Sequence, residues 1–287
     1  METKELLKKV RKIEIKTRRL SNHIFSGEYH SHFKGRGMTF SEVRKYQFGD
    51  DIRDIDWNVT AKLNEPHIKI FEEERELTMM LLVDVSKSES FGTRIQQKRD
   101  LITELCAVLA FSAIQNNDKV GVIFFTDQIE LYIPPKKGKS HILRIIRELI
   151  EFQPKSNGTD ISEALRFLSS VVKKRSIVFA LSDFQDEDYD KNLKIASNKH
   201  DLTAIRIYDT AEEQLPNMGL VQIQNPESGA TRWVDTSSKL VRANYEKDYI
   251  EFVQKFKSNC THSGTDYIDL RVDRSYTKQL LEFFKRR

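Results

Sequence analysis

Short apolar runs alternate with helix-spaced apolar positions through most of the chain after residue 76. Continuous apolar runs are typical of strands buried on both faces of a sheet; they lie at residues 79–83, 176–181 and 202–207. Two further runs, separated by three polar residues, predict a hairpin over 120–125 and 129–133. Shorter strands are expected at 221–223 and 232–234. Apolar residues three or four positions apart predict helices, which lie at 94–115, 142–149, 161–172, 245–256 and 280–284.

This alternation predicts an α/β fold. Its sheet is mostly parallel with helices on both faces, and the hairpin supplies one antiparallel edge strand. Residues 1–75 differ in composition: they are rich in charged residues and have few long apolar runs. We therefore expect an N-terminal charged segment over 1–75 that packs on a main α/β domain over 76–287.

The composition is that of a globular protein, and the charge is too nearly balanced to indicate a strongly charged partner. Of its 287 residues, 39% are hydrophobic and 31% charged, with a formal net charge of only +4. This balance argues against a dedicated nucleic-acid or membrane-surface protein. Cys106 and Cys260 lie in apolar helical patterns and are expected to be buried, reduced thiols. The first twenty residues carry charges throughout, and no apolar stretch reaches the length of a spanning helix. A cytoplasmic protein without direct membrane insertion is expected.

Polar side chains stand where a parallel sheet usually carries its site. The run 79–83 leads into an Asp-x-Ser-x-Ser sequence, a threonine precedes the helix at 161–172, and an aspartate follows the strand at 176–181. Because sites in such folds lie at the carboxyl ends of the strands, we expect these side chains in one crevice. Two carboxylates and three hydroxyls are hard oxygen donors that suit Mg²⁺ or Mn²⁺. The candidate metal ligands are Asp84, Ser86, Ser88, Thr159 and Asp183.

Such a donor set neutralises a divalent ion only in part, so a carboxylate from a partner could complete its coordination. This favours metal-mediated docking over hydrolysis, and no catalytic residue is assigned. Two other interpretations stay open. Asp and Ser also follow strands as turn and cap residues. The same ion could activate water in a metal-dependent phosphoester hydrolase, with Lys87 as the phosphate-binding cation; a Lys87 side chain turned inward would instead weaken the metal affinity.

The candidate ligands also resemble a known site. Asp84, Ser86 and Ser88, Thr159 within GTDISEAL, and Asp183 within LSDF are similar to the metal-ion-dependent adhesion site (MIDAS) of von Willebrand factor type A domains. The stretch DKVGVIFFTDQIELYIPP is similar to the hairpin region of those domains. The resemblance implies a von Willebrand A-like, Rossmann-like fold and a protein-interaction role.

The first region resembles a bacterial family called domain of unknown function 58 (DUF58). The residues that carry this resemblance lie within 35–76 and are Arg44, Tyr46, Gly49-Asp50-Asp51, Arg53, Asp56-Trp57 and Glu73-Glu74. Members of that family carry a von Willebrand A-like domain and accompany MoxR-type AAA+ ATPases. The resemblance therefore implies an adaptor or co-chaperone role with such an ATPase or its client as partner.

Read from its residues alone, the charged segment favours a salt-bridged cap that packs Phe48, Ile55 and Trp57 onto the main domain. Acid–base catalysis or a second metal site is the alternative for carboxylates so close together. If the segment contacts a partner instead, the surface would be formed by Arg44, Asp50, Asp51, Arg53, Asp56 and Trp57.

A basic run at residues 8–19 makes the best case for nucleic acid. Its apolar positions predict an amphipathic helix with a basic face, which would suit nucleic-acid binding as a third functional class. The run lacks interleaved aromatic residues, and an acidic protein surface would fit it equally well. No nucleic-acid partner is therefore expected.

Overall fold

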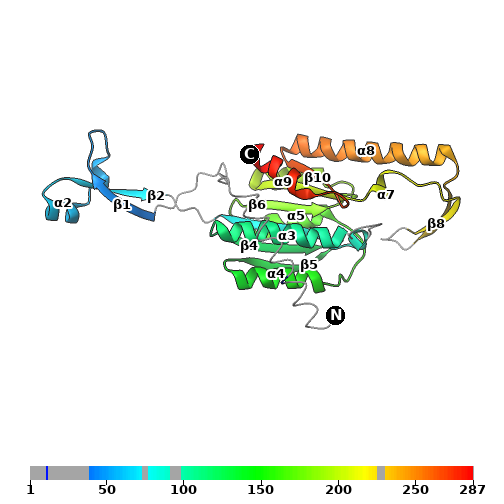
Figure 1. Ribbon diagram of the computed structural model, residues 1–287, viewed down its shortest axis with the longest axis horizontal. Coiled ribbons are helices and arrows are strands. Elements are labelled where there is room, and N and C mark those ends of the chain that lie inside the picture. Colours follow the sequence, from blue (N-terminus) through cyan, green and yellow to red (C-terminus); the bar gives the residue numbers. More distant parts are fainter. Residues whose placement is uncertain (1–10, 12–38, 73–76, 91–97, 225–229, 287) are drawn as a thin grey trace. The chain divides into compact units, whose positions relative to one another are not determined.

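The computed structural model describes residues 11, 39–72, 77–90, 98–224 and 230–286 (Figure 1). The described residues fall into two compact units, a small one within His30–Glu76 and a large one that comprises Arg11 and the described residues of Leu77–Arg287. Each unit has its own sheet structure and is described by itself. The predicted packing of the N-terminal segment on the main domain stays a prediction.

The large unit is built on a six-stranded sheet with the order β10-β7-β6-β3-β4-β5 (Figure 1). Neighbouring strands are parallel except for the β4–β5 hairpin, which places the antiparallel β5 at one edge. The fold class predicted from the apolar runs is confirmed. The strands are β3 (Thr78–Asp84), β4 (Lys119–Phe125), β5 (Ile129–Lys136), β6 (Ile177–Ser182), β7 (Asp201–Tyr208) and β10 (Asp266–Arg271).

Helices cover both faces of this sheet because side chains alternate between its two sides. Met80 and Leu82 of β3 pack on the face covered by α5, α6 and α8. Phe179 of β6 points to the other face, where its ring meets Phe284 of α9 edge to face; α3 and α4 lie on that side as well (Figure 1). The helices are α3 (Lys98–Gln115), α4 (Lys139–Glu151), α5 (Ile161–Val171), α6 (Asp190–Lys199), α7 (Thr210–Glu213), α8 (Lys239–Ser263) and α9 (Tyr276–Arg286). A short 3-10 helix, η2 (Lys87–Ser90), follows β3.

The apolar pattern does not predict β10. This edge strand buries only Ile268 and Leu270 among its six residues, so it shows no continuous apolar run. It is held instead by parallel pairing with β7, a contact between distant parts of the sequence. The predicted helix at 245–256 is longer than its aromatic residues indicate: α8 begins after the Ser238 cap and ends at Gly264 in the left-handed region.

The predicted short strands at 221–223 and 232–234 are confirmed as an antiparallel pair outside the main sheet, β8 (Leu220–Gln224) and β9 (Thr231–Asp235). Cys106 in α3 and Cys260 in α8 are both free and buried, as expected. Across the described ranges, no helix combines the length and the apolar composition that crossing a membrane requires.

The small unit is an antiparallel hairpin of β1 (Thr39–Lys45) and β2 (His67–Glu72). Between the two strands lie a 3-10 helix, η1 (Ile52–Asp54), and the short helix α2 (Trp57–Leu63). Ile68 is buried, and Ile55 forms an isolated bridge with it. The charged composition of this segment does not predict these strands, because their stability comes from pairing rather than from apolar runs.

His200, directly after α6, is a buried histidine whose lost hydration is not replaced by hydrogen bonds to described residues. Its side chain is 1% exposed, and neither ring nitrogen has a hydrogen-bond partner among the described residues. Burial, with further contributions from the charges of Lys199 and Arg175, lowers the pKa of His200 to about 4. The folded protein therefore disfavours the imidazolium form.

Replacing His200 with leucine is expected to reduce acid sensitivity. The unfolded chain protonates this histidine near its ordinary pKa of 6.5, so stability falls as the pH drops below that value and the loss is complete below about 4. Between pH 7.5 and 5.0 this group should cost the wild type about 2 kcal/mol. Urea unfolding of wild type and His200→Leu at both pH values measures the difference. The control is the same substitution at an exposed histidine, His262→Leu. An identical pH response of wild type and His200→Leu would contradict the low pKa of His200.

Candidate functional site

The candidate site lies where the chain leaves two neighbouring parallel strands in opposite directions. From β3 it crosses through α3 to β4 on one side, and from β6 it crosses through α6 to β7 on the other. The carboxyl ends of β3 and β6 therefore flank a switch point, where side chains from two diverging loops meet. Asp84 is the last residue of β3, Ser182 is the last residue of β6, and Asp183 follows it.

Asp84 is held in place by donors from both strands. Its side chain is buried; Oδ2 accepts the Ser182 hydroxyl at 2.7 Å and Oδ1 accepts the Ser86 backbone N–H at 2.9 Å. Burial, followed by the nearby negative charge of Asp183, nevertheless raises the pKa of Asp84 well above its usual range. The two hydrogen bonds do not offset those effects, so this carboxylate would gain from a cation beside it.

The two serines of the loop after β3 lie together. The hydroxyl oxygens of Ser86 and Ser88 are 2.9 Å apart, and Ser86 is buried while Ser88 is half-buried. Lys87 between them is exposed, so its side chain is not turned into the loop. The loop thus presents two hydroxyls without a cation among them.

Backbone hydrogen bonds join this loop to the segment that carries Thr159. The Lys87 N–H donates to the Asn157 carbonyl at 3.3 Å, and the Asp160 N–H donates to the Thr126 carbonyl after β4 at 2.9 Å. Thr159, half-buried, lies between these two anchors. The Ile161 N–H donates to Asp186 in the loop after β6, so all three loops are connected.

Asp183 is buried and engaged in an ion pair that the sequence patterns do not indicate. Its Oδ2 lies 3.0 Å from Nζ of Lys98, and its Oδ1 accepts the Gln185 N–H at 3.1 Å. Lys98 is itself completely buried and forms a second, short ion pair with Glu212 of α7. The structure thus places Asp84, Ser86, Ser88 and Asp183 near one another at this edge, and it adds Lys98, Ser182 and Glu212.

A signal for Lys98 is present in the sequence. It precedes Leu101 and Leu105 by three and seven positions, which places a lysine on the apolar stripe of α3. Glu212 follows β7, another parallel strand, at the edge where sites form in this class of fold. Because Glu212 is far from the other site residues in the sequence, its pairing with Lys98 is visible only in the tertiary structure.

The residues at this edge fit a hard divalent cation. Two buried carboxylates and a pair of adjacent hydroxyls are oxygen donors of the kind that Mg²⁺ and Mn²⁺ prefer. The unfavourable ionisation of Asp84 is the feature that a bound cation would relieve. Within the described ranges, no group of three His, Cys, Asp or Glu side chains forms a metal cluster. A site that relies on hydroxyls would not form such a cluster.

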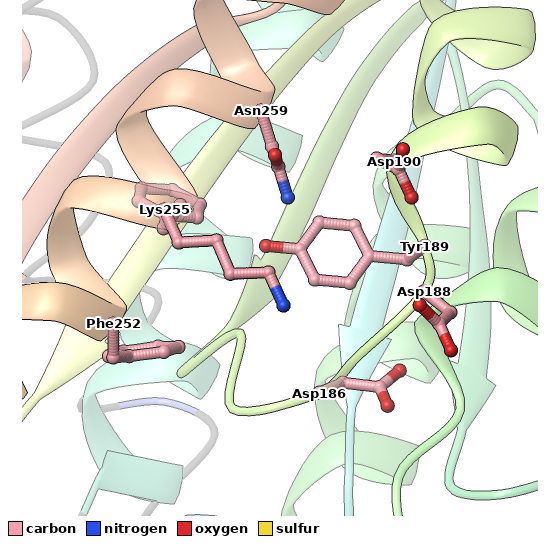
Figure 2. A pocket seen from close by; sticks show the side chains of 8 residues that line it. Asp186, Asp188, Tyr189, Asp190, Phe252, Lys255 and Asn259 are labelled. Atoms are coloured by element: carbon pink, nitrogen blue, oxygen red, sulfur yellow. The ribbon is translucent and has the colours of Figure 1, made fainter. Parts of the chain in front are cut away.

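A separate hollow of about 200 Å³ lies between the loop after β6 and α8 (Figure 2). Tyr189 points from the loop toward Lys255 and Asn259 on α8, and Asp186 and Asp188 lie at the loop side. Burial raises the pKa of Asp186, which also accepts backbone N–H groups from Ile161 and Glu187. Asp186 therefore links the two loops.

In the small unit, the charged residues named as a possible partner surface bind mostly to their own unit. Arg44 donates two hydrogen bonds to Asp50, at 2.8 and 2.7 Å, and the Arg44 guanidinium keeps the pKa of that carboxyl low. Asp51 caps η1 by accepting the Arg53 N–H at 2.9 Å. Asp56 accepts two N–H groups at the start of α2.

Large apolar side chains of the small unit remain exposed beside these charges. Phe48 is fully exposed and Trp57 is 67% exposed; Ile52 and Leu63 are exposed as well. This apolar set, rather than the paired charges, provides the unit with surface that a partner could cover. Whether Phe48 and Trp57 pack on the main domain stays a prediction.

The family model described as "Protein of unknown function DUF58" matches residues 42–253. This range includes the small unit's hairpin from residue 42 onward and the whole candidate site. The chain belongs to the DUF58 family. Its membership accounts for the resemblance of the 35–76 segment, and the family description assigns no activity.

Curated relatives include an uncharacterized protein of Mycobacterium tuberculosis H37Rv, Rv1480, which is 26% identical over 277 residues. The match covers 96% of this chain and 87% of that protein. The uncharacterized protein YeaD of Bacillus subtilis is 25% identical over 109 residues, covering 38% of this chain and 25% of YeaD. Neither of the two names states a function.

Solved structures overlap with this DUF58 chain at low identity. An aerotolerance-related membrane protein from Bacteroides fragilis matches at 15% identity and a TM-score of 0.49, covering 74% of this chain and 100% of that one. BatB, a conserved hypothetical protein from Bacteroides thetaiotaomicron, matches at 16% and 0.47, with the same coverage. The VWA domain of SpRpn10 matches at 10% and 0.41, covering 73% and 95%. The fold assignment rests on the strand order itself.

Removing the Ser182 hydroxyl should destabilise the large unit. Ser182→Ala takes away the donor to Asp84 and the acceptor of the Phe184 N–H, both of which are buried. Loss of a hydrogen bond to a buried charged group should lower the free energy of unfolding by about 2 kcal/mol. Chemical denaturation in metal-free buffer measures this loss. Ser170→Ala, at an exposed serine that donates to the Phe167 carbonyl, should change stability by less than about 0.5 kcal/mol. Equal effects of the two substitutions would contradict this account of Ser182.

Proposed function

We propose that this DUF58 protein is a non-enzymatic protein-interaction module that docks a partner through a Mg²⁺ ion at the carboxyl edge of its sheet. The observation that carries the proposal is the pair of buried carboxylates, Asp84 and Asp183, beside the adjacent hydroxyls of Ser86 and Ser88. The von Willebrand A-like architecture supports a role in protein interaction.

The residues that would hold the ion have different tasks. Ser86, Ser88 and Thr159 would donate hydroxyl oxygens, and Asp84 and Asp183 would bind the ion directly or through water. When bound, the ion supplies a Lewis-acidic position that can accept a carboxylate from another protein. The backbone hydrogen bonds between the loops would keep these residues in position before the ion arrives.

The partner proposed is a MoxR-type AAA+ ATPase or its client, which the family resemblance implies. An Asp or Glu of that partner would complete the coordination of the ion. The small unit would add apolar contacts through Phe48 and Trp57, whose exposure supports this role. A cytoplasmic location fits such a partnership and stays a prediction.

The geometry favours docking over the alternatives. A phosphoester hydrolase would need a cation facing the metal, but Lys87 is exposed and Lys98 is buried in ion pairs with two carboxylates. The basic run at 8–19, which carries the nucleic-acid alternative, lies outside the described residues except for Arg11. No observation on the described residues favours either alternative.

Calorimetric titration of Mg²⁺ and of Mn²⁺ into the full chain should give saturable binding at one site. Asp84→Asn and Thr159→Ala should abolish this binding, because each removes an oxygen donor while the fold is retained, as circular dichroism would verify. Asp235→Asn, at an exposed aspartate of β9, is the control and should bind as the wild type does. Normal ion binding by folded Asp84→Asn, or none by the wild type, would disprove the metal site.

Partner docking should depend on the ion. A purified MoxR-type ATPase immobilised on a biosensor should bind the wild type in Mg²⁺ and release it in EDTA. Asp84→Asn should reduce the affinity at least tenfold, because the bridging ion would be lost. Equal binding in Mg²⁺ and in EDTA would show that the two proteins meet elsewhere.

A further inference from the structure

A two-stranded hairpin outside the main sheet carries apolar side chains on one of its faces. β8 and β9 pair antiparallel before the start of α8 and form a sheet of their own, without a third strand among the described residues (Figure 1). In their register Leu220 lies opposite Asp235, and Gln222 lies opposite Trp233. Residues that are opposite one another, or two positions apart on a strand, share a face. Leu220 and Trp233 therefore lie on the same face of the hairpin.

The exposure of the side chains shows which face of the hairpin meets solvent. Val221, Ile223 and Val234, on the second face, are half-buried. On the first face, Leu220 is 64% exposed and Trp233 is 66% exposed. An antiparallel sheet with one solvated face usually carries polar side chains on that face. The hairpin instead presents two large apolar side chains to solvent.

Two further apolar side chains extend this surface at the ends of the hairpin. Met218, two positions before Leu220, is 61% exposed, and Leu240, in the first turn of α8, is 70% exposed. The Met218 N–H donates to Oγ1 of Thr236, which lies between β9 and α8, at 2.8 Å. We call Met218, Leu220, Trp233 and Leu240 the hairpin patch. Exposed apolar patches mark interaction sites, and tryptophan is enriched among the residues that dominate binding energy.

The hairpin patch lies within reach of the edge that carries the proposed metal ligands. Asp183 and Glu212 both pair with Lys98, so α7 lies beside the loop that follows β6. Leu220 follows Glu213, the last residue of α7, by seven positions, which limits their Cα separation to about 25 Å. An interface of standard size covers about 800 Å² on each protein, an area about 30 Å across. A single partner can therefore contact both places.

Basic side chains beside the hairpin patch fit the partner that the metal site requires. Arg232 precedes Trp233 in β9, and Lys239 precedes Leu240 in α8. Both basic residues are exposed, and neither forms an ion pair with a described residue. The proposed function requires a carboxylate of the partner at the ion. An acidic partner surface would be attracted by these two cations as well.

We infer that the hairpin patch is a second docking surface for the partner that binds through the ion, and that it receives an apolar side chain flanked by acidic residues. This inference rests on the proposed function and specifies the surface of its partner. A second copy of this chain fits the patch less well, because a symmetric contact would bring Arg232 and Lys239 of both copies together. The ion holds the partner's carboxylate, and the patch adds affinity through buried apolar area.

Substitutions in the hairpin patch should weaken partner binding without changing ion binding. The probe is the purified MoxR-type ATPase, immobilised on a biosensor in Mg²⁺. Trp233→Ser should reduce the affinity of the full chain for the ATPase at least about tenfold, and Leu220→Ser at least about threefold, because each removes apolar contact area. Trp233→Phe keeps an aromatic ring and should retain most of the affinity. Calorimetric titration with MgCl₂ should give the wild-type ion affinity for all three variants.

Matched controls lie on α6, which contacts the last turn of α8 through Ser197 and Ser263, at the other end from the hairpin. Ile195→Ser removes an apolar side chain that is 48% exposed, and Lys194→Glu reverses an exposed charge beside it. Both controls should bind the ATPase as the wild type does. Lys239→Glu should slow association at low salt at least about threefold, because it opposes the attraction of an acidic surface. Circular dichroism verifies the fold of each variant.

Fluorine NMR reports directly on Trp233. The chain has two tryptophans, so labelling with 5-fluorotryptophan gives two resonances, and Trp233→Phe identifies the one that belongs to Trp233. Addition of the unlabelled ATPase in Mg²⁺ should shift or broaden this resonance, and EDTA should restore it. An unchanged Trp233 resonance in a complex that forms would overturn the inference. A shift that depends on the concentration of the chain alone would overturn it too, because a second copy would then cover the patch.

The results separate this inference from the proposed function. If the ATPase binds the wild type in Mg²⁺ and does not bind Asp84→Asn, but Trp233→Ser and Leu220→Ser bind as the wild type does, docking through the ion stands and the role of the patch is overturned. Loss of Mg²⁺ binding in Trp233→Ser would show that the substitution acts through the fold and would overturn the role as well. If the wild type does not bind the ATPase in Mg²⁺, the proposed partner falls and this inference falls with it.

Discussion

The constraint on which the large unit depends is the burial of two carboxylates at adjacent strand ends. Asp84 and Asp183 are 1% and 2% exposed, at a position where the chain leaves β3 and β6 in opposite directions. Buried charges must be compensated, because water is absent to solvate them. Each carboxylate accordingly accepts a backbone N–H within its own loop, and a hydroxyl or an ammonium from another element adds to it. The arrangement of the loops follows from this requirement.

Backbone hydrogen bonds connect these loops to the sheet. Val85 donates its N–H to the Phe125 carbonyl, Lys87 to that of Asn157, and Asp160 to that of Thr126. These backbone contacts tie the loops after β3 and before α5 to the end of β4. A site built on strand ends and secured in this way needs little rearrangement to receive a ligand, which reduces the entropic cost of binding.

The small unit uses its charges differently from the large one. Its arginine and aspartate residues satisfy the ends of short helices and a turn, and their carboxylates gain hydrogen bonds that keep them ionised. A segment of this length has little core of its own, so such local contacts take the place of apolar burial. The unit therefore leaves Phe48 and Trp57 exposed, and a larger surface would have to cover them.

The sequence alone determined the architecture of the large unit and most of its candidate site. Continuous apolar runs at β3, β6 and β7 specify strands buried on both faces, and the position of Asp84, Ser86, Ser88 and Asp183 after such strands brings them to one edge. These signals are local, since each depends on residues close together in the sequence. The edge strand β10 and the hairpin of the small unit escaped prediction because strand pairing, not apolar content, stabilises them.

Only the tertiary structure decided the electrostatics of the site. Lys98, Asp183 and Glu212 are separated by 85 and 29 positions, and no pattern of spacing relates them. Their ion pairs exist because α3, β6 and α7 converge at one edge of the sheet, where a lysine on an apolar stripe finds its counter-charges. Local sequence can name the residue types that suit a metal ion. The charge that surrounds them depends on contacts between distant elements, which only folding creates.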